Sequence, residues 1–250
     1  MGSQPVCHLF QCFLWQRSLS ILGPTFFVEF SFLVLPYSHS YSFIPERMLT
    51  PRPPVICFEG LDRSGKGTQI TLLSNFLTSL GIPHSVIPSP YRGNSTGALI
   101  NQVLGRQVQL PPLSLHHLFV SNRHEIYPTL LATLSDGQPV ILDRWVSSGR
   151  AYSLAQKLDP TIVMASDLSL LRPDITFYLS GDPSFLAARV GYGGEIYERL
   201  EFQTSVSRYF TELKDPTWVT LDAALSPDQL HLQIREHLAN LPLPTCVKTY

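Results

Sequence analysis

The sequence has few cysteines and few charged residues, and neither sign of charge dominates. Its four cysteines, Cys7, Cys12, Cys57 and Cys246, have no regular spacing, so neither a disulfide scaffold nor a structural zinc site is expected. Charged residues make up 15% of the 250 residues, and the formal net charge is −1. This near balance provides no overall positive field to attract nucleic acid or an anionic membrane, so any anion-binding site must be local.

Long apolar runs are also missing, even in the first 54 residues, whose composition differs from the rest. This segment contains seven of the 14 phenylalanines and seven of the 21 prolines but only five charged residues. Its longest apolar pieces, 18–28 and 30–36, are separated by Glu29 and are shorter than the roughly 20 residues of a membrane-spanning helix. We therefore expect a poorly ordered extension over residues 1–54, followed by one domain over residues 55–250.

A targeting role for this extension is the alternative. A secretory signal has a basic start and a mitochondrial presequence is rich in arginine, whereas the first arginine here is Arg17. The expected location is therefore cytoplasmic, or mitochondrial if residues 1–54 act as a presequence.

From Val55 onward, short apolar runs alternate with segments of helical period. Five runs predict strands, at 55–58, 84–87, 139–142, 175–179 and 218–221. Apolar spacing predicts a helix over 70–80, a mostly helical segment over 113–134 that Pro128 interrupts, and a closing helix over 227–238. This alternation predicts an α/β fold with a five-stranded parallel sheet and helices on both faces, which binds ligands at the carboxyl ends of its strands.

The strongest motif directly follows the first of these strands and opens a helix. It reads Gly60-Leu61-Asp62-Arg63-Ser64-Gly65-Lys66-Gly67-Thr68, with the spacing G-x4-G-K. Small residues let backbone N–H groups turn toward a phosphate chain, and Lys66 adds a positive charge for its β- and γ-phosphates. The strict pattern has Ser or Thr in place of Gly67, so the hydroxyl comes one residue later, at Thr68. A glycine turn with an exposed lysine is the alternative.

Three arginines and one aspartate follow predicted strands. Arg63 lies within the glycine-rich loop, where a guanidinium could offset the charge of a transferring phosphoryl group. Arg92 and Arg144 follow two other strands, and their planar forks match a nucleotide phosphate, although structural ion pairs are the alternative. Asp143 ends the third strand, where it could organise hydrated magnesium or cap a helix.

One predicted helix carries an aromatic–arginine pair and three histidines. Phe119 and Arg123 are four residues apart and share a helix face, so one could stack on a base while the other bonds its edge. Core packing is the alternative for Phe119. His116, His117 and His124 are expected to be structural or solvated, because adjacent residues face different sides and no Cys or acidic pair completes a metal site.

Five motifs in this chain resemble those of the thymidylate kinase family, in the same order, over residues 55–241. They are FEGLDRSGK at 58–66, SPYR at 89–92, LFVSNRHE at 118–125, DRW followed by SG within 143–149, and YE followed by FQ within 197–203. The resemblance implies a P-loop NTPase fold of the nucleoside monophosphate kinase type. It also implies the conversion of dTMP and ATP to dTDP and ADP with magnesium, in dTTP synthesis, by a homodimer.

The resemblance also assigns roles to the matching residues. The catalytic residues are Arg63, Lys66, Asp143 and Arg144. The residues expected to bind ATP are Gly60, Ser64, Gly65, Lys66, Gly67, Thr68 and Arg189. Those expected to bind dTMP are Asp62, Arg92, Phe119, Arg123, Arg144, Ser148, Tyr152, Tyr197 and Gln203. Within this set, Asp62 takes the 3′-hydroxyl and Tyr197 crowds the 2′ position. Asp143 and Glu198 organise magnesium through water.

A lid is expected near residues 187–197, because three glycines among residues 191–194 suit a segment that closes over ATP. Members of the family carry the catalytic arginine either in the P-loop or in the lid, and Arg63 with an arginine-poor lid resembles the first subtype. Ile196 replaces the arginine that the family has before the lid tyrosine. Ile196 and Gly67 leave one alternative, a nucleotide-binding protein that has lost turnover. A second alternative is a kinase that phosphorylates nucleosides or other pyrimidine monophosphates.

Overall fold

The computed structural model describes residues 52–189, 193–242, 244 and 247–250. Its centre is a five-stranded parallel sheet of β1 (Val55–Gly60), β2 (Ser85–Pro88), β3 (Val140–Asp143), β4 (Ile175–Ser180) and β5 (Trp218–Asp222). The strand order is β2-β3-β1-β4-β5. The five predicted strands are confirmed, each end lying within two residues of its prediction.

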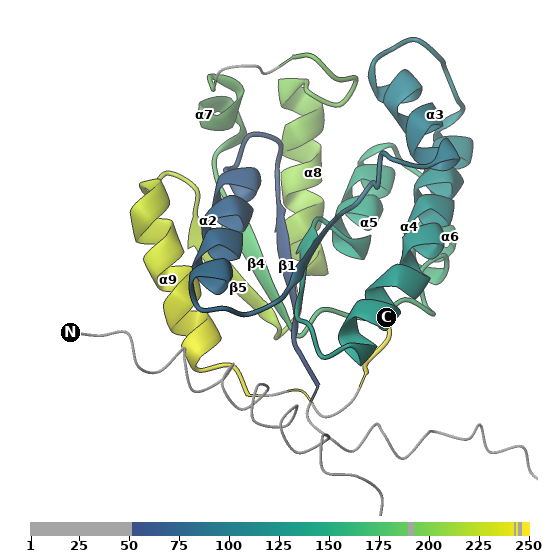
Figure 1. Cartoon of the computed structure of the whole chain (residues 1–250). Helices are drawn as coiled ribbons and strands as arrows, with labels where there is room; N and C mark the ends of the chain where they lie inside the picture. Colours follow the sequence, from purple (N-terminus) through teal and green to yellow (C-terminus); the bar gives the residue numbers. More distant parts are fainter. Residues whose placement is uncertain (1–51, 190–192, 243, 245–246) are drawn as a thin grey trace, which may run out of the picture.

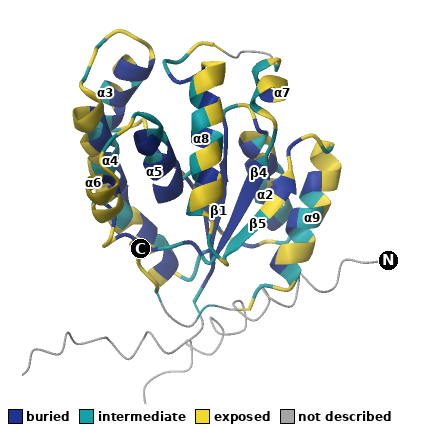
Figure 2. Cartoon of the chain, turned by 180° about the vertical axis from the view of Figure 1, so that it is seen from behind, coloured by how far each residue is buried: buried dark blue, intermediate teal, exposed yellow. Residues whose placement is uncertain are grey.

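Helices cover both faces of the sheet, as predicted (Figures 1 and 2). They are α2 (Lys66–Ser79), α3 (Ser95–Leu104), α4 (Pro112–Ser135), α5 (Val146–Ala155), α6 (Pro160–Ala165), α7 (Pro183–Ala187), α8 (Leu200–Leu213) and α9 (Pro227–Ala239). Helices α2 and α9 pack together on one face, and α5 and α8 pack together on the other. In Figure 2 the buried side of α8 faces the sheet and its outer side is exposed.

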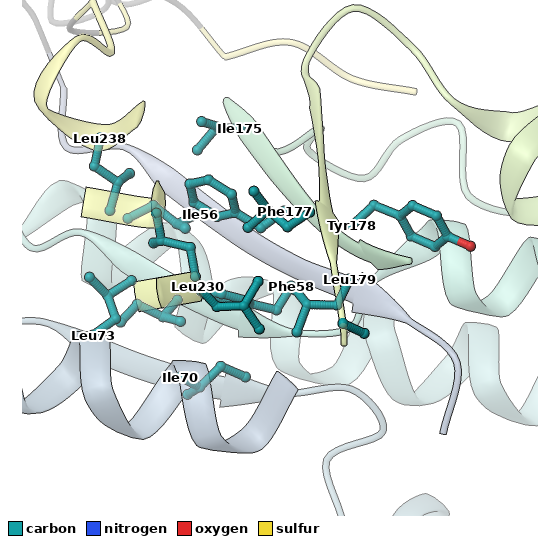
Figure 3. Close-up of a cluster of buried hydrophobic side chains, with 14 of the residues drawn as sticks. Ile56, Phe58, Ile70, Leu73, Ile175, Phe177, Tyr178, Leu179, Leu230 and Leu238 are labelled. Carbon is teal, nitrogen blue, oxygen red and sulfur yellow. The ribbon is translucent and has the colours of Figure 1, made fainter. Parts of the chain in front are cut away.

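Strand β1 is central in the sheet and is buried along its whole length. Side chains alternate between its faces. Ile56 and Phe58 point toward α2 and α9, where Figure 3 shows them beside Leu73 and Leu230. Cys57 belongs to the core cluster of the opposite face, which α4 covers. A strand buried on both faces is normally apolar throughout, so the charged residue Glu59 in this strand needs its own explanation.

The turn from β1 into α2 depends on two glycines. Gly60 has φ +145°, and a Cβ at this position would lie 2.6 Å from the carbonyl oxygen of Leu179. Gly65 has φ +100° and is the N-cap of α2, which no side chain caps. The N–H groups of the first helical turn are therefore directed at the loop without a side-chain acceptor, which is the arrangement that binds a phosphate.

The helix predicted over 113–134 is confirmed as α4, but the predicted interruption at Pro128 is wrong, because α4 runs through this residue. A proline inside a helix removes the hydrogen bond to the carbonyl four residues before it. Here that carbonyl belongs to His124, and both residues are exposed, so water can satisfy it. Apolar spacing does not predict helices α3, α5, α6, α7 or α8.

Residues 1–51 of the expected extension lie outside the described residues. Arg52 also precedes the predicted boundary, yet it is tied to the domain: its guanidinium donates two hydrogen bonds of 2.8 Å to Asp174. Its backbone N–H donates to the carbonyl of Pro244 at 2.8 Å. Within the described part of the chain, no helix is long and apolar enough to cross a membrane.

We expect Gly67→Ala to raise the free energy of unfolding by about 0.5–1 kcal/mol, because alanine favours a helix and a Cβ at Gly67 would meet no atom within 4 Å. Gly60→Ala is the contrasting variant and should lower it by more than about 1 kcal/mol, owing to strain and the contact with Leu179. Urea unfolding of both variants without ligand measures the difference. A loss of stability in Gly67→Ala would contradict this account of the loop.

Candidate active site

Residues that follow four strands meet at the carboxyl edge of the sheet. The P-loop, residues 60–68, follows β1, Arg92 follows β2, Arg144 follows β3, and the predicted lid, near residues 187–197, follows β4. An open pocket at this edge is lined by eight of the nine residues predicted to bind dTMP: Asp62, Arg92, Phe119, Arg123, Arg144, Ser148, Tyr152 and Tyr197. The ninth, Gln203, donates from its side chain to Asp62 at 2.8 Å. The structure therefore brings the predicted acceptor residues together.

Lys66 lies beneath the P-loop and is only 7% exposed. Its Nζ donates to the carbonyl of Leu61 at 2.7 Å, to that of Gly60 at 3.2 Å, and to Ser64 Oγ at 3.3 Å. Burial, and then the positive charge of Arg144, lower the pKa of Lys66 to about 7. A phosphate chain over the loop would supply the negative charge that favours protonated lysine.

Most of the other predicted ATP residues lie in the same loop or in the first turn of α2. Ser64 is fully buried within the loop, whereas Gly67 and Thr68 are exposed in the first turn of α2. The ATP role predicted for the Thr68 hydroxyl, one position later than in the strict P-loop pattern, stays a prediction.

Arg63 and Arg189 flank the mouth of the P-loop. Arg63 has φ 63°, in the left-handed region that L-residues rarely adopt, and its side chain is 42% exposed. Arg189 donates to the carbonyl of Arg63 and to that of Ala223, both at 2.7 Å. Its guanidinium also lies over the ring of Phe185, 4.9 Å from the ring centre. Arg189 thus bridges the P-loop and the segment after β5, while Arg63 extends from the P-loop itself.

Asp62 and Arg144 form an ion pair that joins the loop after β1 to the loop after β3. The other carboxylate oxygen of Asp62 accepts from the Tyr152 hydroxyl at 3.0 Å and from Gln203 Nε2 at 2.8 Å. Burial would raise the pKa of Asp62, but the charges of Arg144 and Lys66 and these two hydrogen bonds lower it below its usual value. Since an ionised carboxylate has about four acceptor sites, Asp62 can accept one more hydroxyl group.

The Arg144 guanidinium is fixed from several sides. Its Nη1 donates to the carbonyl of Gly60 at 2.7 Å and to Ser148 Oγ at 3.1 Å, and its guanidinium lies over the ring of Tyr152. The backbone has φ 67°, and its N–H donates to the carbonyl of Phe58 at 3.0 Å. Backbone strain of this kind persists only where the surroundings over-determine the conformation.

Arg123 lies at the inner end of the pocket and is 1% exposed. Its Nε and Nη2 donate to the carboxylate of Asp167 at 3.0 and 2.9 Å. Gly149 is required beside it, because a Cβ there would lie 2.6 Å from Arg123 Nη1. Phe119, one helical turn earlier on α4, is half-buried and lines the same pocket. The shared helix face predicted for these two residues is confirmed, although two of Arg123's donors are used by Asp167.

Aromatic rings close another wall of the pocket. Tyr197 stacks on Phe202, with ring centres 5.0 Å apart and an angle of 12°, and meets Tyr152 edge-on at 5.3 Å. Gln203 holds the chain here, since its Nε2 donates to the carbonyl of Tyr197 at 2.9 Å. Burial raises the pKa of Tyr152 and of Tyr197 well above the usual value, so both hydroxyls are neutral donors.

Two glutamates at the C-terminal end of the predicted lid, Glu195 and Glu198, contact arginines of other loops. Glu195 pairs with Arg92 at 2.9 Å, and both side chains are exposed. Glu198 is nearly buried, lies 3.4 Å from Arg63, and accepts from the backbone N–H groups of residues 193–195. Residues 190–192 of the predicted lid lie outside the described residues.

Sequence reasoning missed two buried carboxylates and the environment of His116. Asp167 and Glu59 are both fully buried. His116 lines the pocket, and its ring nitrogens lie 2.8 Å from Ser153 Oγ and 3.1 Å from Ser166 Oγ. Burial, and then the charge of Arg123, lower the pKa of His116 to about 4. It is thus a structural histidine, and no group of described residues could hold a metal ion with protein ligands alone.

This architecture defines a class of protein. A parallel sheet of order 2-3-1-4-5 carries a P-loop after its central strand, and Arg144 and Arg92 follow the two neighbouring strands on one side. The result is a P-loop fold of the nucleoside monophosphate kinase type, as the sequence predicts.

Comparisons with known proteins identify the family. The thymidylate kinase family model matches residues 58–234. A thymidylate kinase from Arabidopsis thaliana is 38% identical over 191 residues, which are 76% of this chain and 73% of the plant protein. The thymidylate kinase of Homo sapiens is 32% identical over 192 residues, which are 75% of this chain and 91% of the human protein.

A solved structure agrees with these relatives. The thymidylate kinase of Candida albicans matches with a TM-score of 0.71 and 32% sequence identity, over 80% of this chain and 99% of that chain. The chain therefore belongs to the thymidylate kinase family.

We expect Asp167→Ala to lower the free energy of unfolding by about 3–5 kcal/mol, because it leaves the charge of Arg123 buried without its partner. Glu212→Ala is the matched control, since its ion pair with Arg208 is exposed and should contribute less than about 1 kcal/mol. Urea unfolding measures both. Equal effects of the two substitutions would show that burial of the Arg123–Asp167 pair has no energetic consequence.

Proposed function

We propose that this chain is an ATP-dependent thymidylate kinase, which transfers the γ-phosphoryl group of ATP to the 5′-phosphate of dTMP and releases dTDP and ADP, as a step of dTTP synthesis. The observation that carries the proposal is the position of the pocket directly beside the P-loop, where the Asp62–Arg144 ion pair joins the two. A nucleotide phosphate bound by Arg144 would then face a phosphate chain bound over Lys66.

The reaction needs positioning and charge stabilisation more than acid–base chemistry. An oxygen of the acceptor phosphate forms a bond to the γ-phosphorus while the bond from that phosphorus to the β–γ bridging oxygen breaks, and ADP leaves with the electron pair. A dianionic acceptor phosphate has no proton to remove. Lys66 and Arg63 offset charge on the transferred group, and Arg144 and Arg92 hold the acceptor.

The pocket supports a pyrimidine deoxynucleotide as the acceptor. Phe119 offers a face for the base, and Arg123 Nη1, the nitrogen not bonded to Asp167, can reach its edge. Asp62 has an acceptor site for the 3′-hydroxyl, and the ring of Tyr197 crowds the sugar. In this scheme, Arg92 leaves its ion pair with Glu195 and binds the phosphate when dTMP enters the pocket.

Magnesium fits at Asp143 better than at Glu198. Asp143 ends β3 beside the P-loop, and none of the hydrogen bonds among the described residues uses its carboxylate. Glu198 already serves three backbone N–H groups and Arg63, so its contacts favour an anchor for the lid. Magnesium keeps several waters at such sites, and when bound it neutralises charge on the β- and γ-phosphates.

We further propose a homodimer, supported by apolar side chains left exposed on two helices that lie side by side in both views (Figures 1 and 2). These are Leu113 and Leu131 of α4 and Ile162 and Met164 of α6. A cytoplasmic location, or a mitochondrial one if residues 1–54 act as a presequence, stays a prediction from the sequence.

A coupled assay of ADP formation across dTMP, dUMP, UMP and thymidine tests the proposal. We expect the highest kcat/KM with dTMP, low activity with UMP, and none with thymidine. Phe119→Ala should weaken dTMP binding by about 10-fold or more, because stacking on a base contributes roughly 1–3 kcal/mol, while ATP affinity stays unchanged. Activity on thymidine alone would indicate a nucleoside kinase, and binding of ATP and dTMP without ADP formation would indicate a protein without turnover.

Arg63→Ala tests which arginine is catalytic. Because a charge that acts in the transition state contributes to kcat, we expect a loss of about 10³-fold in kcat with little change in the affinity for dTMP. Arg189→Ala is the matched variant and should mainly weaken ATP binding, since it contacts the P-loop backbone. Single-turnover rates measure both effects. A near-normal rate in Arg63→Ala with a severe loss in Arg189→Ala would assign the catalytic arginine to the lid segment.

A further inference from the structure

Glu59 is a charged residue in the middle of the sheet, where charge is costly. It is fully buried on the central strand β1, next to Gly60 of the P-loop, and it points to the face opposite Phe58. A buried carboxylate without partners would cost several kcal/mol, so its hydrogen bonds indicate what it does. The hydrogen bonds that the structure shows for the Glu59 carboxylate all come from residues at the start of α5.

The first function of these bonds is to cap α5. The N-cap residue of this helix is Trp145, whose side chain cannot accept a hydrogen bond, and no side-chain cap is present. Glu59 Oε1 accepts from the N–H of Trp145 at 3.0 Å and from that of Ser148 at 3.1 Å. Ser148 is the third helical residue, whose N–H an N-cap side chain normally binds. A residue of β1 therefore replaces the missing cap, and the helix N-terminus favours its negative charge.

The second function is to orient a hydroxyl. Ser148 Oγ donates to Glu59 Oε2 and accepts from Arg144 Nη1 at 3.1 Å. A guanidinium can only donate, so Ser148 must accept from Arg144, and its own proton must point to another acceptor. Glu59 Oε2 is that acceptor. The chain of bonds therefore runs in one direction, from Arg144 through Ser148 to Glu59.

We propose that Glu59 is a positioning residue of the acceptor-phosphate site, which acts through Ser148 to hold the Arg144 guanidinium toward the phosphate of the nucleoside monophosphate. The proposal rests on the proposed function, because it assumes that Arg144 binds the acceptor. It goes beyond that function by adding a residue that touches neither substrate. In the proposed scheme ATP binds over Lys66 and the P-loop, outside this chain of bonds.

Glu59→Gln separates the two functions. The amide oxygen can still accept from both N–H groups and cap α5, but the amide nitrogen is a donor and gives the Ser148 proton no acceptor. We expect the Kd of dTMP to rise about 10-fold, as for loss of a hydrogen bond to a charged group, and the Kd of ATP to change less than about 2-fold. Isothermal titration of the full chain with each nucleotide measures both constants.

Double variants test whether Glu59 affects dTMP binding through Ser148 and Arg144. Ser148→Ala breaks the same chain, so Glu59→Gln in that background should not weaken dTMP binding further. The same holds in an Arg144→Ala background. Ser148→Ala also keeps the proposal testable if Glu59→Gln fails to fold. Additive losses in these double variants would overturn the proposal, as would unchanged dTMP affinity in folded Glu59→Gln.

Cys57→Ala is the control for a general loss of stability. Cys57 lies two residues earlier on the same face of β1 and belongs to the core, not to the site. It should lower the melting temperature without changing the Kd of dTMP, and an equal change in that Kd would show that the Glu59 effect is merely structural. If wild-type protein does not phosphorylate dTMP, the proposed function fails separately, and the same comparison is then made with whichever monophosphate of the assay is phosphorylated.

Discussion

The ion pair between Asp62 and Arg144 is the interaction on which the rest of the site depends. It connects the loops that follow β1 and β3, two neighbouring strands that end at the same edge of the sheet. Arg144 reaches it with a backbone in the left-handed region, supported by the carbonyls of Phe58 and Gly60. The P-loop and the pocket beside it are therefore fixed relative to one another without a bound nucleotide. Phosphoryl transfer benefits from such fixed positioning, because misplacement of the reacting atoms is costly in rate.

Positive charge is concentrated at this edge although the whole chain is nearly neutral. The structure balances it locally. Arg144 pairs with Asp62, Arg92 with Glu195, and Arg63 with Glu198. The first pair is largely buried and holds the site together, whereas the pair between Arg92 and Glu195 is exposed, so a phosphate can replace it at little cost. In the proposed scheme, Glu195 and Glu198 occupy arginines that bind the phosphates of the substrates, so the position of the predicted lid is coupled to substrate binding.

The parts of this site that follow one another in the sequence could be predicted, and the parts that depend on distant partners could not. The P-loop residues share one short segment, and Phe119 and Arg123 are four apart on α4, so spacing alone was informative. Asp167 is 44 residues from Arg123, and nothing near either residue shows that they pair. The role of Glu59 likewise depends on Ser148, 89 residues away. Their partners are visible only in the folded chain.

The same distinction holds for the secondary structure. Strands β1, β3 and β4 are mostly buried and largely apolar, and short apolar runs predict the ends of all five strands to within two residues. Helix α5 was not predicted, because seven of its ten residues are buried and no polar face marks its period. The sequence predicts an interruption of α4 at Pro128, whereas the exposed position of this residue makes the lost hydrogen bond tolerable. Local rules fail where burial or solvent exposure decides the outcome.

The central claim is that one nucleotide phosphate on Arg144 faces a phosphate chain on Lys66 across a preformed site. The most direct measurement is the affinity of the full chain, with magnesium, for a molecule in which thymidine and adenosine are joined through five phosphates. If the two sites are in line, joining the two halves makes the second binding event intramolecular, and the molecule should bind at least about 100-fold more tightly than ATP or dTMP alone. An affinity no greater than that of ATP would contradict the account.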